Sequence, residues 1–262
     1  MSAIIIQDEI VHYEVLGRGR PVIFTHGWVG SWRYWIPSMQ AASTSFRAYA
    51  LDLWGFGDTA REPGKYLLNE QAALLGDFLF EMGIQKTALI GHGLGAIVSL
   101  LFAKKFPQTV DRVMAICMPF SSDALNPRLQ QAPPGELANW LMGETPESQA
   151  ARAEAVKTDQ DAILRSIYNL QNIEIERLAT ETETPSLLVF GKNDPAITLT
   201  TNGDLFSLPE RVHSIVFDDS GHFPMMDQVN KFNRLMIDFL SLPSGESPRQ
   251  LQLKDEWKRR IR

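Results

Sequence analysis

The sequence predicts an α/β fold in which one twisted, mostly parallel sheet of eight strands is covered by helices on both faces. Short apolar runs rich in β-branched residues alternate along the chain with longer stretches of helical periodicity, and this alternation is typical of parallel sheets. The chain has 262 residues, of which 44% are hydrophobic, and this is enough to bury the core of one domain built on a single sheet.

Eight short apolar runs are predicted as strands. A polar turn over residues 7–9 joins the first two into a hairpin, and the other six have the length and composition of buried strands in a parallel sheet. In order, the predicted strands are Ile4–Ile6, Ile10–Val15, Pro21–Thr25, Arg47–Leu53, Lys86–Ile90, Arg112–Cys117, Ser186–Phe190 and Val212–Phe217.

Five further segments have apolar residues at helical spacing. They alternate with the strands, as crossover connections between parallel strands require. In order, the predicted helices are Trp32–Ala42, Leu68–Met82, Leu94–Phe106, Gly203–Leu208 and Met225–Leu240.

The alternation breaks between Pro119 and Glu183, where helical patterns and loops rich in proline and glycine follow one another without a strand. Open α/β sheets bind ligands at the carboxyl ends of their strands, and an insertion that follows a strand suits a lid over that edge. We therefore expect a discontinuous core of residues 1–118 and 184–242, a helical lid of residues 119–183, and a polar, basic C-terminal tail of residues 243–262.

Composition excludes several classes of function. The formal charge of −6 and the pI near 5.4 disfavour a nucleic-acid partner, because the net field repels polyanions. Cys117 is the only cysteine, which rules out an internal disulfide and suits a reducing, cytoplasmic location. The N-terminus lacks the charged start of a signal peptide, and no apolar run is long enough for a membrane span. Oligomeric state is left open.

The segment Gly91 to Gly95 carries every residue of the nucleophile-elbow motif G-x-S-x-G except the nucleophile, because Gly93 occupies the central position. A strand precedes the segment and a helix follows it, as the motif demands. Glycine reaches the strained backbone angles of such a turn without a Cβ clash. The alternative of a phosphate-binding loop fails, because the spacing differs from that motif and no lysine follows.

Two backbone amides are expected to form an oxyanion hole. Trp28 follows the predicted strand Pro21–Thr25, and Leu94 follows the nucleophile position. Their N–H groups are placed to stabilise a developing oxyanion, a role in which one donor contributes about 3 kcal/mol. The imidazole of His26 is expected to be a structural hydrogen-bonding group in the turn.

Asp194 and His222 each follow a predicted strand, and the chain order elbow, acid, histidine is the one expected for this arrangement. The acid would hold the imidazole in one tautomer and stabilise its cation. Asp218 and Asp219 lie too close to His222 along the chain to orient its ring. No histidine or cysteine spacing indicates a metal, and no dinucleotide fingerprint follows the first strand, so no cofactor is expected.

On these motifs the chain resembles the α/β-hydrolase-fold proteins of the lipase, esterase and haloperoxidase-like group over about residues 3–241. The segments 52–59 and 220–224 resemble the D-x-x-G-x-G-x-S loop and the histidine loop of that group. The resemblance implies Asp194 as acid, His222 as base, and the amides of Trp28 and Leu94 as oxyanion donors. It also implies a small apolar ester or other carbonyl ligand. The residues expected to line its pocket are His26, Trp54, His92, Trp140 and Phe223.

The missing serine leaves four interpretations open. The chain is a serine-hydrolase scaffold that has lost its nucleophile, naturally or by engineering, and therefore has little acyl-enzyme turnover. Alternatively, His222 and Asp194 act alone as a base in a water-activating hydrolase, a lyase or a cofactor-free oxygenase. As a third alternative, the site binds a small ligand without turnover. Finally, another nucleophile serves, although Cys117 is expected to be an inert core thiol and Ser31 a helix cap.

Overall fold

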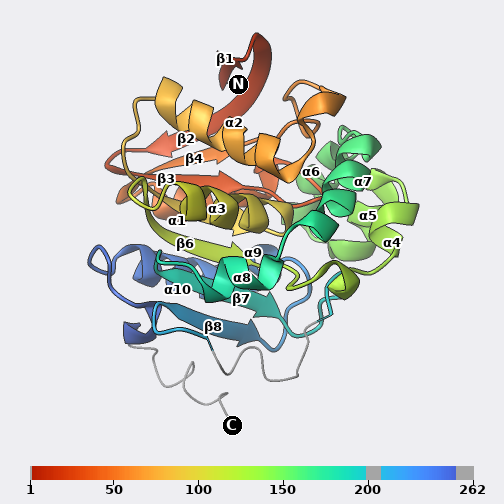
Figure 1. Ribbon diagram of the computed structural model, residues 1–262. Helices are drawn as coiled ribbons and strands as arrows, with labels where there is room; N and C mark the ends of the chain where they lie inside the picture. Colours follow the sequence, from red (N-terminus) through yellow and green to blue (C-terminus); the bar gives the residue numbers. More distant parts are fainter. Residues whose placement is uncertain (1, 199–207, 252–262) are drawn as a thin grey trace.

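A computed structural model describes residues 2–198 and 208–251 (Figure 1). Its eight strands form one sheet in the order β1-β2-β4-β3-β5-β6-β7-β8, antiparallel at β1, β2 and β4 and parallel from β4 onward. This confirms the predicted fold class. The strands are β1 Ser2–Ile6, β2 Glu9–Gly17, β3 Arg20–Thr25, β4 Phe46–Leu51, β5 Thr87–His92, β6 Val110–Ile116, β7 Ser186–Gly191 and β8 Val212–Phe217.

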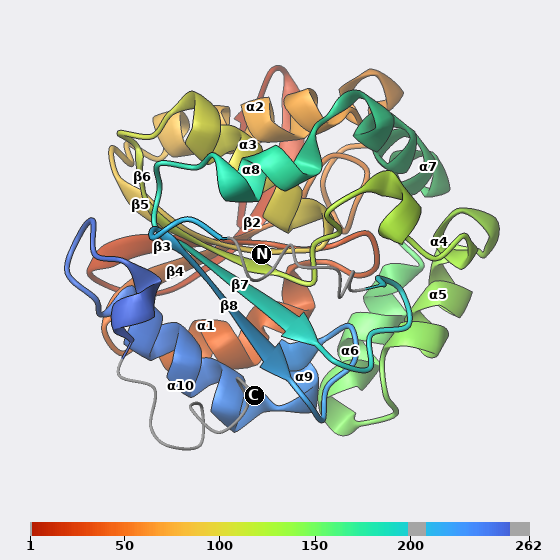
Figure 2. The same cartoon turned by 60° about the horizontal axis from the view of Figure 1, so that its bottom comes forward.

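Helices cover both faces of the sheet (Figure 2). On one face, α1 (Ile36–Ala42) packs beside α10 (Val229–Leu240). On the other face, α3 (Leu94–Lys105) packs between α2 (Leu68–Glu81) and α8 (Ile175–Thr180). The central strands are therefore buried on both faces, and this accounts for their nearly continuous apolar sequence.

Two predicted helices are interrupted in the structure. The segment Trp32–Ala42 begins as a 3₁₀ turn, Trp32–Trp35. Helix α1 starts at Ile36, and its second residue, Pro37, has no amide hydrogen with which to continue a helix from the preceding turn. The segment Met225–Leu240 is divided at Gln228 into α9 (Pro224–Asp227) and α10. The helix predicted over Gly203–Leu208 lies, apart from Leu208, outside the described residues.

The segment between β6 and β7 contributes helices at the carboxyl ends of the strands, on the right of Figure 1. These helices are α4 (Arg128–Gln131), α5 (Pro134–Leu141), α6 (Pro146–Ala155) and α7 (Gln160–Asn169). Helix α8 belongs to the same segment but packs against α3. None of the helices within the described ranges is long and apolar enough to cross a membrane.

Candidate active site

The turn between β5 and α3 has the backbone geometry of a nucleophile elbow. Gly93 adopts φ +50° and ψ −111°, a conformation that L side chains rarely adopt. A Cβ on Gly95 would overlap the carbonyl oxygen of Thr25, whereas a Cβ on Gly93 would have its nearest neighbours, Gly27 Cα and the Trp28 ring, at 3.4 Å. The spacing at Gly93 is ordinary van der Waals contact, so the elbow has room for a side chain at its central position.

The amides around this turn fall into two groups. Three of them are hydrogen-bonded: Gly27 N–H donates to Tyr34 Oη at 2.6 Å, Gly93 N–H to Ile116 O at 2.8 Å, and Gly95 N–H to His26 O at 3.0 Å. The amides of Trp28 and Leu94 have no acceptor among the described residues, although both residues are fully buried. Because a buried N–H group without an acceptor is costly, these two donors are suited to receive a ligand oxygen.

The acid and the histidine lie in contact. His222 Nδ1 is 2.8 Å from Asp194 Oδ2, and both side chains are almost completely buried. The other carboxylate oxygen, Asp194 Oδ1, accepts hydrogen bonds from the amides of Ala196 and Ile197, which fix the orientation of the acid. With the Nδ1 proton donated to Asp194, the Nε2 atom of His222 is left as the basic nitrogen.

The structure brings two of the five expected pocket residues into contact with His222. The ring of His92 lies 4.6 Å from that of His222, and the ring of Phe223 lies 5.2 Å from it, centroid to centroid. The Trp54 ring lies beneath the Lys65 ammonium group, and the Trp140 ring lies beneath the guanidinium group of Arg128. Their place in the pocket stays a prediction.

His26 has a structural environment. Its Nδ1 donates to Gly27 O at 2.8 Å, and its Nε2 accepts from Leu53 N–H at 3.0 Å, so both ring nitrogens are used within the core. Burial lowers the pKa of His26, which keeps the ring neutral. The imidazole therefore braces the turn before Trp28.

Two residues of this region carry no signal in the sequence. Tyr34 places its hydroxyl between the Gly27 amide and the His92 ring. Ser166, on α7, accepts a hydrogen bond of 3.0 Å from Trp28 Nε1. The contacts of Tyr34 with His92 and of Ser166 with Trp28 join positions 58 and 138 residues apart, so neither periodicity nor a local motif could identify these residues.

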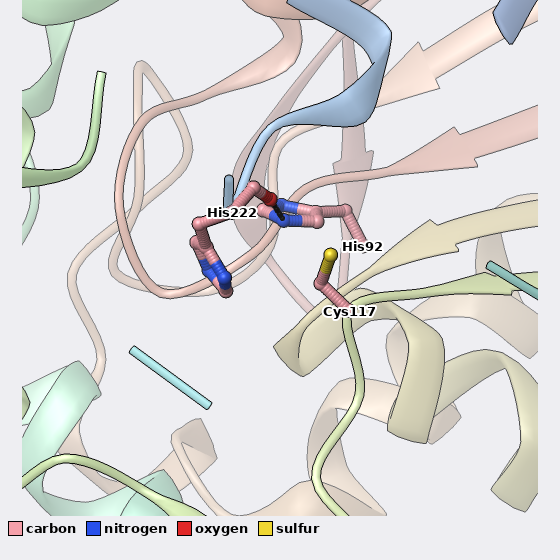
Figure 3. A group of neighbouring side chains, drawn as sticks. All are labelled: His92, Cys117 and His222. Atoms are coloured by element: carbon pink, nitrogen blue, oxygen red, sulfur yellow. Dashed lines mark hydrogen bonds between the residues drawn. The ribbon is translucent and has the colours of Figure 1, made fainter. Parts of the chain in front are cut away.

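Cys117 lies closer to the polar groups than the sequence suggested. It directly follows β6 with φ +45°, and burial, reinforced by the negative charge of Asp194, raises the pKa of its thiol well above the ordinary value. Its sulfur and one ring nitrogen each of His92 and His222 lie within 4.8 Å of one another (Figure 3). Both nitrogens of His92 already have hydrogen-bond partners, so a metal at this trio would have to displace them.

A groove of about 480 Å³ runs along the loops that carry the acid and the histidine. Its lining includes Leu141 and Thr145 from the segment between β6 and β7, and Asn193, Pro195 and Gly221 from the loops after β7 and β8. Because the last three residues adjoin Asp194 and His222 in the chain, this groove lies beside the His222–Asp194 pair.

A parallel sheet with an elbow after β5, an acid after β7 and a histidine after β8 defines the architecture of an α/β hydrolase. A model of the Alpha/beta hydrolase family matches residues 22–235, and the chain belongs to this family.

Similar proteins include hydrolases of several carbonyl compounds. RutD of Yersinia enterocolitica, named for carbamate hydrolysis, is 25% identical, with 93% of this chain and 96% of RutD covered. The 2-hydroxy-6-oxo-2,4-heptadienoate hydrolase of Pseudomonas putida is 28% identical, with 86% and 91% covered. Among solved structures, a serine-to-glycine mutant of the N-acyl homoserine lactonase AidH, complexed with N-hexanoyl homoserine lactone, superposes with a TM-score of 0.80 at 18% identity, covering 91% and 96% of the two chains.

Proposed function

We propose that this protein binds a small apolar ester or related carbonyl compound at the elbow and has lost covalent acyl transfer. The observation that carries the proposal is the conformation of Gly93, which keeps the elbow geometry while offering no attacking atom. The proposal is supported by the amides of Trp28 and Leu94, which have no acceptor among the described residues, and by the hydrogen-bonded His222–Asp194 pair. The binding and polarising groups are thus retained, and the nucleophile is missing.

The chemistry follows from these groups. The carbonyl oxygen of a bound ester accepts hydrogen bonds from the Trp28 and Leu94 amides, which polarise the carbonyl carbon. In acyl transfer a serine hydroxyl would then attack, with His222 Nε2 taking its proton and Asp194 stabilising the imidazolium. Without that hydroxyl the covalent path is closed, and kcat falls by about 10⁶ relative to an intact triad.

The relatives support the class of ligand. Their names specify hydrolysis of a carbamate and of a 2-hydroxy-6-oxo-dienoate, and AidH is a lactonase. The AidH structure also pairs a serine-to-glycine replacement with a bound lactone. We infer a reducing, cytoplasmic location from the lone, buried Cys117, and a lid role for residues 119–183 from their place at the strand ends.

A second candidate function is favoured by the intact, buried His222–Asp194 hydrogen bond of 2.8 Å. A histidine held in this way is able to act as a general base on a water molecule or on a substrate C–H group. The protein would then be a dyad enzyme without a covalent intermediate.

The substitution Gly93→Ser tests the primary proposal, with Gly93→Ala as its matched control. We expect Gly93→Ser to hydrolyse a short p-nitrophenyl ester at least about a thousandfold faster than the parent, because it restores the missing nucleophile. Gly93→Ala adds the Cβ without the hydroxyl and should stay at the parent rate. Both should lose about 1 kcal/mol of unfolding free energy to the positive φ. A folded Gly93→Ser that hydrolyses the ester no faster than Gly93→Ala would refute the proposal.

The substitution His222→Ala separates binding from dyad catalysis. If the parent only binds, His222→Ala should keep most of its affinity for the p-nitrophenyl ester, measured by calorimetry. If the dyad turns substrate over, the residual rate of the parent should fall by about a hundredfold or more.

A further inference from the structure

A chain of buried hydrogen bonds joins the three loops of the site. Gly27 N–H donates to Tyr34 Oη at 2.6 Å, Tyr34 Oη lies 3.0 Å from His92 Nδ1, and His92 Nε2 lies 2.8 Å from the backbone carbonyl oxygen of His222. Figure 3 shows the last of these bonds. We refer to these four groups as the relay.

The partners determine where each proton lies. A carbonyl oxygen only accepts, so His92 Nε2 carries the hydrogen and donates it to His222 O. His92 Nδ1 is then an acceptor and receives the hydroxyl proton of Tyr34. The Tyr34 oxygen in turn accepts from Gly27 N–H, so every donor in the relay has an acceptor. Burial, with a smaller contribution from the nearby His222, lowers the pKa of His92 well below its ordinary value, as this neutral tautomer requires.

The relay connects the loop of Trp28, the turn of Gly93 and the loop of His222. Gly27 precedes the oxyanion donor Trp28, and His92 precedes Gly93. Phe223 packs edge-on against Tyr34 and His222 and at 4.8 Å from His92, so the histidine loop is fixed by packing as well as by hydrogen bonding. Apart from the His222–Asp194 bond, the His92 bond is the described polar contact that fixes His222.

We propose that Tyr34 and His92 are positioning residues, which fix the position of the His222 imidazole relative to Gly93 and to the amides of Trp28 and Leu94. The inference rests on the proposed function in that a correctly placed His222 matters only if it acts on the ligand. The hydrogen bonding itself is measurable in the parent protein without any ligand.

The first test uses nuclear magnetic resonance of the histidine rings in the parent chain. We expect His92 to remain the neutral Nε2–H tautomer across the range in which free histidine titrates, with a slowly exchanging Nε2 proton. In Tyr34→Phe that proton should exchange at least about tenfold faster, because Nδ1 has lost its donor. Tyr49→Phe is the matched control, since Tyr49 is also buried but packs against Tyr13 and Phe78, on the other side of the core. An unchanged exchange rate in Tyr34→Phe would overturn the relay.

The second test uses kinetics in the Gly93→Ser background. Tyr34→Phe should lower kcat about tenfold while KM changes less than about twofold, because a displaced base weakens the chemical step rather than binding. His92→Gln keeps a donor for His222 O and should be the milder variant, whereas His92→Leu removes it and should be the more severe one. Equal rates for His92→Gln and His92→Leu would contradict a positioning role. If Gly93→Ser itself is inactive, the proposed function fails, and the resonance experiment still decides the relay.

Discussion

At the scale of single residues, the three glycines of the elbow have different reasons to be glycine. A Cβ at Gly91 or Gly95 would overlap backbone atoms, so packing alone excludes other residues there. Gly93 has ordinary clearance and differs from the motif only in lacking a side chain. On the proposed function, a glycine at position 93 lacks the attacking hydroxyl, while a Cβ there would meet no backbone overlap.

The buried pair His12–Asp52 gives a residue-scale prediction about pH. His12 Nδ1 lies 2.8 Å from Asp52 Oδ2. Burial alone would lower the pKa of His12, but the hydrogen bond and charge of Asp52, with Asp58 and Glu14 adding to it, raise the pKa overall. The folded protein thus holds this proton more tightly than the unfolded chain. The resulting stabilisation is complete below about pH 6.5 and is lost as the pH rises through the folded-state pKa.

We therefore expect His12→Gln to reduce the free energy of unfolding more at about pH 5.5 than at about pH 8.5, measured with denaturant. His213 provides a control of opposite sign, because burial and then Arg249 lower the pKa of His213. The contribution of His213 to the free energy of unfolding falls as the solution is acidified. His213→Gln should therefore lessen the loss of unfolding free energy between about pH 8.5 and about pH 5.5. A His12→Gln effect that is larger at the alkaline pH would contradict the assignment.

At the scale of elements, helix α7 is linked to the loop that follows β3 by the hydrogen bond from Trp28 Nε1 to Ser166 Oγ. Ser166→Ala leaves this indole N–H buried without an acceptor and should lower the unfolding free energy by about 1–3 kcal/mol. Thr158→Val is the control, because the Thr158 hydroxyl is buried without a partner among the described residues. That variant should be neutral or stabilising in the same denaturation experiment. Equal losses in the two variants would contradict a specific role for Ser166.

The elements that the sequence predicts well are those fixed by local periodicity. Every strand boundary lies within two residues of its prediction, because β-branched runs bounded by turn residues have few alternatives. The sequence does not predict the break between α9 and α10 at Gln228. The residue before the break, Asp227, accepts hydrogen bonds through its carboxylate from Ser220 Oγ and from the amide of Gly221. Those partners hold α9 on the histidine loop, a tertiary constraint that the helical pattern of the segment does not contain.

At the scale of the whole molecule, Arg112 joins the sheet to helix α10 and to the segment that follows it. Arg112 lies on β6 and is fully buried although its side chain is charged. Its guanidinium group donates to the carbonyl oxygens of Phe239 and Pro243 and to the carboxylate of Asp111. Arg112→Lys cannot satisfy all these acceptors, since lysine lacks the planar fork. We expect it to cost about 3 kcal/mol of unfolding free energy. Arg47→Lys is the control, because Arg47 lies on β4 and is exposed. It should change the free energy of unfolding by less than about 0.5 kcal/mol. Similar costs would contradict this role for Arg112.

The site was partly predictable because its motifs lie at strand ends, which a parallel sheet gathers along one edge. This logic places Gly93, Asp194 and His222 on one side of the molecule from the sequence alone. The contacts of Tyr34 with His92 and of His92 with His222 span 58 and 130 residues and depend on side-chain packing. The rings of Trp54 and Trp140 contact cationic side chains, and their place in a ligand pocket stays a prediction.

The central claim is that Gly93 occupies the position of a nucleophile in an otherwise retained site. The most direct measurement is labelling of Gly93→Ser with a fluorophosphonate, followed by intact mass and peptide mapping. We predict one adduct, on the introduced serine, none on Gly93→Ala, and labelling at least about a hundredfold slower when His222→Ala is added. A folded Gly93→Ser protein that acquires no adduct at position 93 would contradict the account.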